Sequence, residues 1–350
     1  MLLMDFGKNQ VNLCLIRCET FNEVMPFSLA AFETAKGLIK MAQIKPLPDD
    51  LQEIAIRELG EVTSRIPEDL EDLKSWIEQQ PHLKACTDDQ FLVQFLRGSK
   101  YSLEKAKRKI DQFYTLRTKY PEFLLTCDVD EPIFRKIHNT SSGVVLPTPL
   151  NGNGPRIVYL RPNFAPDDFT ATSICQYMFT LVETLLLSDS YACVHGFIFL
   201  IDNTLTLVSH FTTLVTPNLV SKIFSFMEKA FPIRIKGIYF FNISPVVEKL
   251  AKLLLPYIPE KIRNRVHFCG NNLEDLRDYV PKKYFPQDCG GGNGSVDDLV
   301  RDYNKVWDEY REYFRRNSEF GTDESLRCGE SYQIVDEFGV GGSFRKLNVD

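Results

Sequence analysis

The sequence contains no long hydrophobic run. None of its apolar stretches approaches the roughly 18 to 20 residues that a helix needs to cross a bilayer. The apolar letters VNLCLI near the N-terminus are too few for the core of a secretory signal. We therefore expect any contact with a membrane to be peripheral.

The motifs of common catalytic sites are also missing. We find no GxSxG elbow, no GxxxxGKS/T phosphate loop, no HExxH and no HxE…PCxxC pattern. The five histidines are far apart in the sequence and have no metal-ligand spacing. We predict that the protein is not an enzyme and uses no cofactor and no metal, although distant residues could still converge in space.

An excess of basic charge is lacking as well, since 41 Lys and Arg face 47 Asp and Glu, for a net charge of −6. A general nucleic-acid binder carries basic residues that neutralise phosphates, so we expect no nucleic acid as partner and only a local anion site. The nine cysteines form no CxxC pair, and Cys14 and Cys18 have no second pair at zinc-site spacing. We expect reduced thiols in a cytoplasmic protein, acting as a monomer.

Helical periodicity begins at Pro46, and apolar residues then recur every three or four positions in two successive segments as far as Ile77. The letters TDDQ offer Thr87 as a helix N-cap with Gln90 three residues later, which is a capping box. A further helix is predicted after Ser102, and we interpret its charged run EKAKRK as a solvated surface. No strand is expected before residue 120.

The pattern changes near Pro121. Short β-rich runs, GVVLP, RIVYLRP, VHGFIFLID and IKGIYFFN, alternate with apolar helical stretches at 170–188 and 208–230, which indicates an α/β fold. The runs GFIFLID and GIYFFN are apolar on both alternating rows, as is typical of strands that are covered on both faces. An amphipathic helix follows from Val296.

These changes of pattern divide the chain into four parts. Residues 1–45 form an N-terminal extension, part of which could be poorly ordered, and residues 46–125 form an all-helical bundle. Residues 126–291 form the α/β domain, and residues 292–350 form a C-terminal helix and tail.

Positive charge is concentrated around one strand, in the letters FPIRIKGIYFF, where Arg234 and Lys236 project from the same face. Between Lys222 and Arg265 there are nine Lys or Arg and three Glu, a local balance of +6 in an acidic chain. This concentration suggests an anion site, while the alternative is a set of scattered, solvated charges.

Several motifs in order resemble the CRAL-TRIO lipid-binding family, and within it the branch of α-tocopherol transfer protein, cellular retinaldehyde-binding protein and clavesin. These motifs are FLRGSKYSLEKAK, YPEF, FPIRIKGIYFFN, EKIRNRVHFCGNN and the closing GG of FPQDCGG, and they span roughly residues 46 to 291. The resemblance implies a helical bundle followed by a wrapped, mixed sheet that encloses an apolar cavity under a helical lid.

The resemblance also implies a lid at VVEKLAKLLLPYIPEKI, where Val247, Leu250, Leu254 and Tyr257 recur at helical spacing. The same pattern suits an ordinary amphipathic helix that covers a core. A closed apolar cavity is expected beneath residues 245–258.

The resemblance also implies that Arg234, Lys236, Lys261 and Arg265 bind phosphoinositide, because they match basic positions of the family's phosphoinositide-binding members. The candidate residues of the cavity wall are Met178, Val182, Phe197, Ile201, Ile235 and Ile238. Strict alternation cannot place both Ile235 and Ile238 on one face, so either Gly237 marks a bulge or one isoleucine belongs to the ordinary core.

The leading hypothesis is a carrier of a hydrophobic small molecule, which releases its ligand at phosphoinositide-containing membranes of the endosomal system or the cell surface. The alternative is an adaptor that senses phosphoinositide without transferring cargo. Tocopherol, retinoid, carotenoid, sterol and phospholipid cannot be separated as ligands, because the predicted wall is merely apolar.

Overall fold

The computed structural model describes residues 42–270 and 276–328. The predicted extension therefore lies almost wholly outside the described residues, as do residues 329–350 of the predicted tail. The helices are α2 (Asp49–Ile54), the π-helix η1 (Ala55–Leu59), α3 (Ile66–Glu78), α4 (Asp89–Gly98), α5 (Leu103–Lys119), α6 (Pro121–Leu124), α7 (Pro132–His138), α8 (Ala171–Ser188), α9 (Ser190–His195), α10 (Val208–Leu214), α11 (Pro217–Lys229), α12 (Pro245–Leu254), α13 (Glu260–Arg263) and α14 (Val296–Arg316). The strands are β1 (Leu83–Lys84), β2 (Gly143–Val145), β3 (Arg156–Leu160), β4 (Phe197–Asp202), β5 (Ile235–Phe241), β6 (Val266–Phe268) and β7 (Gly321–Thr322).

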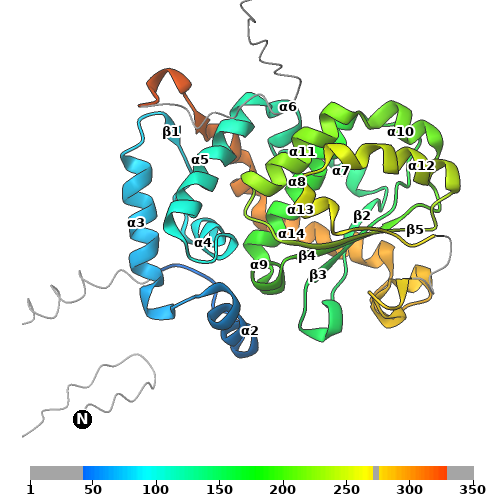
Figure 1. The fold of residues 1–350 in the computed structure, drawn as a ribbon, viewed down its shortest axis with the longest axis horizontal. Helices are drawn as coiled ribbons and strands as arrows, with labels where there is room; N and C mark the ends of the chain where they lie inside the picture. The colour runs from blue at the N-terminus through cyan, green and yellow to red at the C-terminus, as the bar shows by residue number, and fades with distance from the viewer. Residues whose placement is uncertain (1–41, 271–275, 329–350) are drawn as a thin grey trace, which may run out of the picture. The chain divides into compact units, whose positions relative to one another are not determined.

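Helices α2 to α5 precede the main sheet, as the periodicity predicts (Figure 1). Their buried faces carry the predicted apolar residues, such as Leu70, Leu73 and Ile110. The predicted N-cap of α4 is wrong by one residue, because the side chain of Asp88, and not of Thr87, accepts the hydrogen bond from the Phe91 amide at 3.0 Å. An Asp at this position satisfies the free amides of the first turn as well as a Thr does.

The main sheet has the strand order β2-β3-β4-β5-β6. Strand β2 is antiparallel to β3, and the remaining pairs are parallel, so the sheet is mixed, as expected. The predicted helix at 208–230 is broken into α10 and α11, because Pro217 occupies the first turn of α11 and Thr216 caps it.

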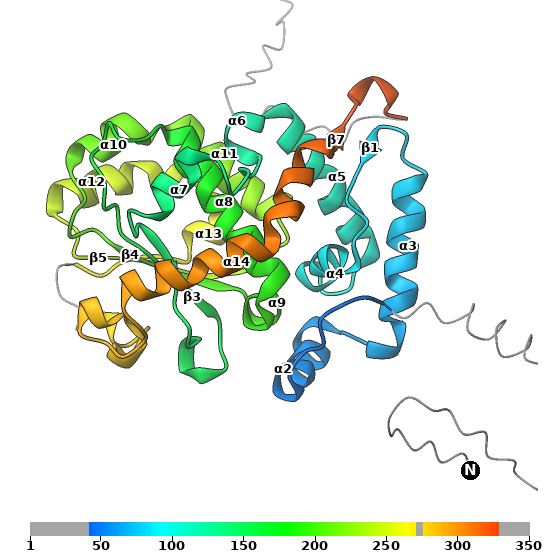
Figure 2. The ribbon, with the colours of Figure 1, turned by 180° about the vertical axis from the view of Figure 1, so that it is seen from behind.

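Both faces of the sheet are buried, as the doubly apolar strands predict. The inner face carries alternate residues such as Phe199 and Ile238, and helices α8, α10, α11 and α12 lie over it (Figure 1). The outer face carries Ile198 and Leu200, which pack with residues 276–300. In Figure 2, α14 runs from the sheet to the helical module beside α5.

The expectation that no strand precedes residue 120 is wrong in one place. Strand β1 pairs with β7, with Leu83 opposite Thr322 and Lys84 opposite Gly321. Each strand has only two residues, which is too short for any alternation to be visible in the sequence. The pair ties the segment that follows α14 to the helical module.

A β-bulge interrupts the pairing of β4 with β5. Phe197 lies opposite Ile235, but the next residue, Ile198, lies opposite Gly237, so Lys236 is the extra residue. One extra residue shifts the alternation by one, and this places both Ile235 and Ile238 in the core of the inner face. The bulge that the sequence analysis offered as one alternative is therefore present next to Gly237, and the other alternative also holds, because Ile235 is buried outside the cavity lining.

Candidate functional site

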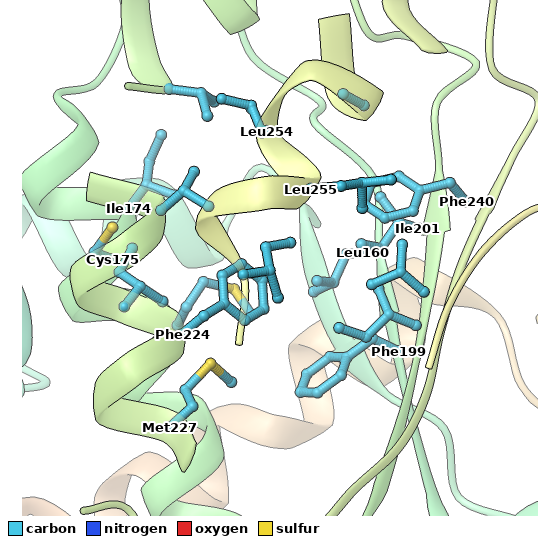
Figure 3. Close-up of a pocket in the computed structure, with 18 of the residues that line it drawn as sticks. Leu160, Ile174, Cys175, Phe199, Ile201, Phe224, Met227, Phe240, Leu254 and Leu255 are labelled. Carbon is cyan, nitrogen blue, oxygen red and sulfur yellow. The ribbon is translucent and has the colours of Figure 1, made fainter. Parts of the chain in front are cut away.

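A cavity of about 330 Å³ lies between the inner face of the sheet and the helices that cover it (Figure 3). In this view, Ile174 and Cys175 of α8 face Leu160 and Ile201 of the sheet across the open space. The wall consists of Leu160, Phe199, Ile201, Ile238, Phe240, Val266 and Phe268 from the strands and Ile174, Cys175, Met178, Phe179, Val182, Phe211, Val215, Val220, Ile223, Phe224, Met227, Ala251, Leu254, Leu255 and Ile258 from the helical layer. This volume falls at the lower end of the range of small-molecule pockets.

Four of the six predicted wall residues line this cavity, namely Met178, Val182, Ile201 and Ile238. The other two, Phe197 and Ile235, do not. They lie opposite each other at the first residues of β4 and β5 and are almost completely buried in the solid core. In β4 and β5, only residues that follow the bulge line the cavity. Whether any of these residues contacts a ligand stays a prediction.

The segment predicted as a lid covers the cavity, but it does so with a different set of side chains. Of the four predicted lid residues, only Leu254 lines the cavity. The other lining residues of this segment, which were not predicted, are Ala251, Leu255 and Ile258. These four lining residues also recur at the spacing of an amphipathic helix. The sequence pattern therefore allowed this face as well as the predicted one, which lies one residue earlier.

The three other predicted lid residues lie elsewhere on this segment. Val247 is buried outside the cavity lining, and neither Leu250 nor Tyr257 belongs to the lining. Tyr257 is 47% exposed, because a 3-10 turn at Leu255–Tyr257 rotates the chain after α12 ends.

Arg234 is largely committed to the fold. Its Nη2 atom donates to the carbonyl oxygen of Cys193 at 2.6 Å and to that of Val194, near the C-terminal end of α9. Burial lowers the pKa of the Arg234 guanidinium to about 10, against nearby charges that act mostly in the other direction. A positively charged side chain at this helix end stabilises the otherwise unpaired carbonyls.

Lys236 is exposed at the bulge, so its ammonium is accessible to an anion. Its pKa is lowered, first by partial burial and then by the neighbouring charges of Arg234, Arg265 and Lys100, while Glu58 opposes this effect. The Nη1 atom of Arg265 donates to the carbonyl of Ile235. The structure therefore brings three of the four predicted basic residues into one electrostatic neighbourhood.

Lys261, the fourth predicted basic residue, is exposed, and its positive charge affects the pKa of Lys109 in α5. The Lys109 ammonium donates to the carbonyls of Glu228 at 3.0 Å and Phe231 at 3.2 Å. Burial, reinforced by the charge of Lys261, lowers the pKa of Lys109 to about 8.

Lys100, which lowers the pKa of Lys236, and Lys109, whose pKa is lowered by Lys261, belong to the helical module, and the sequence analysis missed both. For Lys109, the interpretation of the run EKAKRK as a purely solvated surface is wrong, because its ammonium is held against the end of α11. No pattern within the run distinguishes Lys109 from the other lysines.

Within residues 42–270 and 276–328, no group of three or more His, Cys, Asp or Glu side chains could hold a metal ion. The seven cysteines described there are free thiols.

The buried carboxylate of Asp202 accepts hydrogen bonds from the hydroxyls of Tyr159 and Thr204, both at 2.6 Å, and from Asn242 at 2.9 Å. Its partners belong to the loops and strands around it, which is the arrangement of a structural carboxylate. In the described part of the chain, no helix is both long and apolar enough to span a membrane.

Fold and site together define a class of protein in which a helical module precedes an α/β domain, and a helix of that domain roofs an apolar cavity. Comparison with known families agrees. Residues 141–291 match the CRAL/TRIO domain, and residues 62–134 match the Pinta-like UBA domain. The chain therefore contains a CRAL/TRIO domain, and the resemblance inferred from its motifs is confirmed.

Curated relatives are similar over most of the chain. The chain is 26% identical over 256 residues to the α-tocopherol transfer protein-like protein of Mus musculus, covering 72% of each chain. It is 27% identical over 274 residues to clavesin-1 of Mus musculus, covering 76% of this chain and 75% of the relative. A crystal structure of Sfh5 matches with a TM-score of 0.44 and 12% identity, over 73% of this chain and 92% of that one.

Proposed function

We propose that the protein is a cytoplasmic carrier, which holds a hydrophobic small molecule in the cavity and releases it at phosphoinositide-containing membranes. The observation that carries the proposal is the apolar cavity beneath Ala251, Leu254, Leu255 and Ile258. The similarity to α-tocopherol transfer protein-like proteins supports a role in transfer. The protein would attach only transiently to endosomal or plasma membranes.

The strength of burial explains why a carrier of this kind needs a trigger. A ligand with some twenty buried methylene groups gains roughly 16 kcal/mol, at about 0.8 kcal/mol for each, before the costs of ordering. Spontaneous escape into water would be slow. Release into a membrane requires an opening whose equilibrium responds to the membrane itself.

The basic residues are suited to act as this trigger because of where they lie in the chain. Leu255 and Ile258 line the roof of the cavity, and Lys261 and Arg265 follow within ten residues. An anionic headgroup that binds Lys236, Lys261 and Arg265 more tightly in the open state would shift the lid toward that state. The shift can be no larger than this difference in affinity.

Arg234 contributes a positive charge to this site more than it contributes direct contacts. Because its Nη2 atom is engaged by two carbonyls, we assign it a smaller share of the headgroup binding than Lys236. The four residues still form the proposed phosphoinositide site. An adaptor that senses phosphoinositide and transfers no cargo is the second candidate, and the basic neighbourhood alone would suffice for it.

The carrier function is tested by the protein's own cargo. We expect native mass spectrometry of protein purified from a eukaryotic host to detect one bound small molecule per chain, which organic extraction recovers. Protein that repeatedly carries no extractable molecule, even after incubation with lipid extracts, would leave the adaptor as the better explanation.

The membrane trigger is tested by reversing exposed lysines. Each Lys near an anionic surface contributes about 1 kcal/mol. The double variant Lys236→Glu and Lys261→Glu removes two such attractions and adds two repulsions of similar size, so it loses roughly 4 kcal/mol. We expect its binding to vesicles with phosphoinositide to weaken by two to three orders of magnitude at low salt, with cargo binding unchanged.

A matched control changes the same charge elsewhere. Lys84 and Lys305 are exposed and lie outside the basic neighbourhood, so Lys84→Glu with Lys305→Glu lowers the net charge equally. We expect this control to float with phosphoinositide vesicles as the wild type does. Equal losses in both double variants would mean that net charge, and not this site, governs docking.

A further inference from the structure

Every side chain that lines the cavity is aliphatic, aromatic or sulfur-containing. The sticks in Figure 3 accordingly contain carbon and sulfur only. Among the described residues, Cys175 is the one lining side chain with a polar hydrogen, and its thiol is a weak donor. Burial raises the pKa of this thiol to about 12, so it stays protonated and uncharged. Within the described residues, the wall offers no strong partner for a hydroxyl, carbonyl or carboxylate.

Two buried polar residues in the middle of α8, the helix that forms one wall, already have hydrogen-bond partners within the protein. Thr180 donates to the carbonyl of Gln176 at 2.8 Å and accepts from the Cys127 amide at 3.0 Å. Glu183 accepts from Arg117 at 2.8 Å. Because these groups are buried and paired within the protein, none can turn to meet a polar group of the cargo without losing its own partner.

We infer that the cavity selects an unfunctionalised hydrocarbon, a chain or ring system without a buried hydroxyl, aldehyde or carboxylate. The inference rests on the proposed carrier function and narrows its ligand class. A hydroxyl carried into this cavity exchanges its water for no partner, which disfavours an alcohol relative to the matching hydrocarbon by roughly 5- to 150-fold. A carboxylate is disfavoured further, since its charge would also be buried.

Competition among three probes with the same carbon chain tests this selectivity. Full-length protein is incubated with phosphatidylcholine vesicles that contain equal amounts of hexadecane, 1-hexadecanol and hexadecanoate and no phosphoinositide. Protein is then separated from the vesicles, and the bound probes are quantified by mass spectrometry after extraction. We expect hexadecane to exceed 1-hexadecanol at least fivefold and hexadecanoate by more.

The outcomes distinguish this inference from the function on which it rests. Equal retention of the three probes, or preference for the alcohol or the acid, overturns the hydrocarbon selectivity and leaves the carrier function intact. Retention of none of the probes, nor of any lipid from a cell extract, overturns the carrier function and the inference with it.

A substitution in the cavity wall tests whether the wall itself causes the preference for hydrocarbon over alcohol. Met178→Gln puts an amide on the wall at nearly constant volume, so we expect the ratio of bound 1-hexadecanol to hexadecane to rise severalfold. The control is Leu253→Gln, since Leu253 lies on the roof helix α12 but is 69% exposed and outside the lining, and we expect no change in the ratio. An unchanged ratio in Met178→Gln, in protein that folds and binds hexadecane, would contradict the assignment of selectivity to the cavity wall.

Discussion

Gly196 permits the close approach of the chain at the start of two central strands. Its φ is +87° and its ψ is −153°, a conformation that is open almost only to glycine. A Cβ atom built on Gly196 would lie 2.0 Å from the carbonyl oxygen of Arg234, which is backbone and cannot rotate away. The amide of Phe197 donates to that same carbonyl at 2.8 Å, so the contact also fixes the register of β4 against β5.

We predict that Gly196→Ala destabilises the protein by about 3 kcal/mol or more, because backbone strain and steric overlap add. Urea unfolding followed by tryptophan fluorescence measures the loss. Gly292→Ala is the matched control, since a Cβ there would meet nothing closer than 3.6 Å, and we expect a change within about 0.5 kcal/mol. Similar stabilities for the two variants would contradict the role of Gly196.

At the scale of elements, His138 connects α7 with α8 and α14. Its Nδ1 lies 3.1 Å from the Tyr177 hydroxyl, and its Nε2 lies 2.9 Å from the Val300 carbonyl. Burial lowers the pKa of His138 to about 4, and the charge of Arg135 acts in the same direction, while the hydrogen bond to Val300 opposes them. The folded protein therefore holds this imidazole neutral at pH values where an exposed histidine is protonated.

The consequence is a pH-dependent stability with a defined sign. The unfolded chain takes up this proton near pH 6.5 and the folded chain only near pH 4, so stability falls as the pH is lowered between these values. We predict a loss of about 3 kcal/mol from this group between pH 7 and pH 4. The loss should be absent in His138→Gln when urea unfolding is measured across this range. Parallel pH profiles for wild type and variant would contradict it.

The sequence predicts most elements of this fold but not their finer registration. Alternation along β4 and β5 correctly indicates strands covered on both faces, and most of the predicted wall residues line the cavity. Of the residues predicted for the lid, Leu254 lines the cavity and Val247, Leu250 and Tyr257 do not; for Tyr257 the reason is the 3-10 turn at Leu255–Tyr257, which changes the helical phase after α12. Nothing in the sequence indicates that Arg234 is engaged by carbonyls of α9 or that Lys109 reaches α11, since both contacts join distant segments.

At the scale of the whole molecule, the segment after α14 fastens to the helical module through a buried ion pair. The Nη1 atom of Arg327 lies 3.0 and 2.9 Å from the two carboxylate oxygens of Asp111. His82 approaches the same carboxylate at 2.9 Å. Together with the β1–β7 pair, this contact closes the chain onto its first helices.

We predict that Arg327→Ala lowers the free energy of unfolding by about 2–4 kcal/mol, because it leaves a buried carboxylate with only one partner. Arg301→Ala serves as the control, since that arginine is 71% exposed and its pairing with Asp298 contributes little. Chemical denaturation of both variants is the measurement. A loss no greater than that of Arg301→Ala would mean that the C-terminal contact does not stabilise the module.

The same contact also sets the order in which the protein can be completed during synthesis. Asp111 and β1 leave the ribosome long before their partners, Arg327 and β7, which are more than 200 residues further along the chain. At 5 to 20 residues per second, this interval lasts roughly 10 to 50 s. Throughout it, the helical module has a carboxylate without its arginine and a strand edge without its neighbour. The part of the protein that is made first is therefore among the last to be finished.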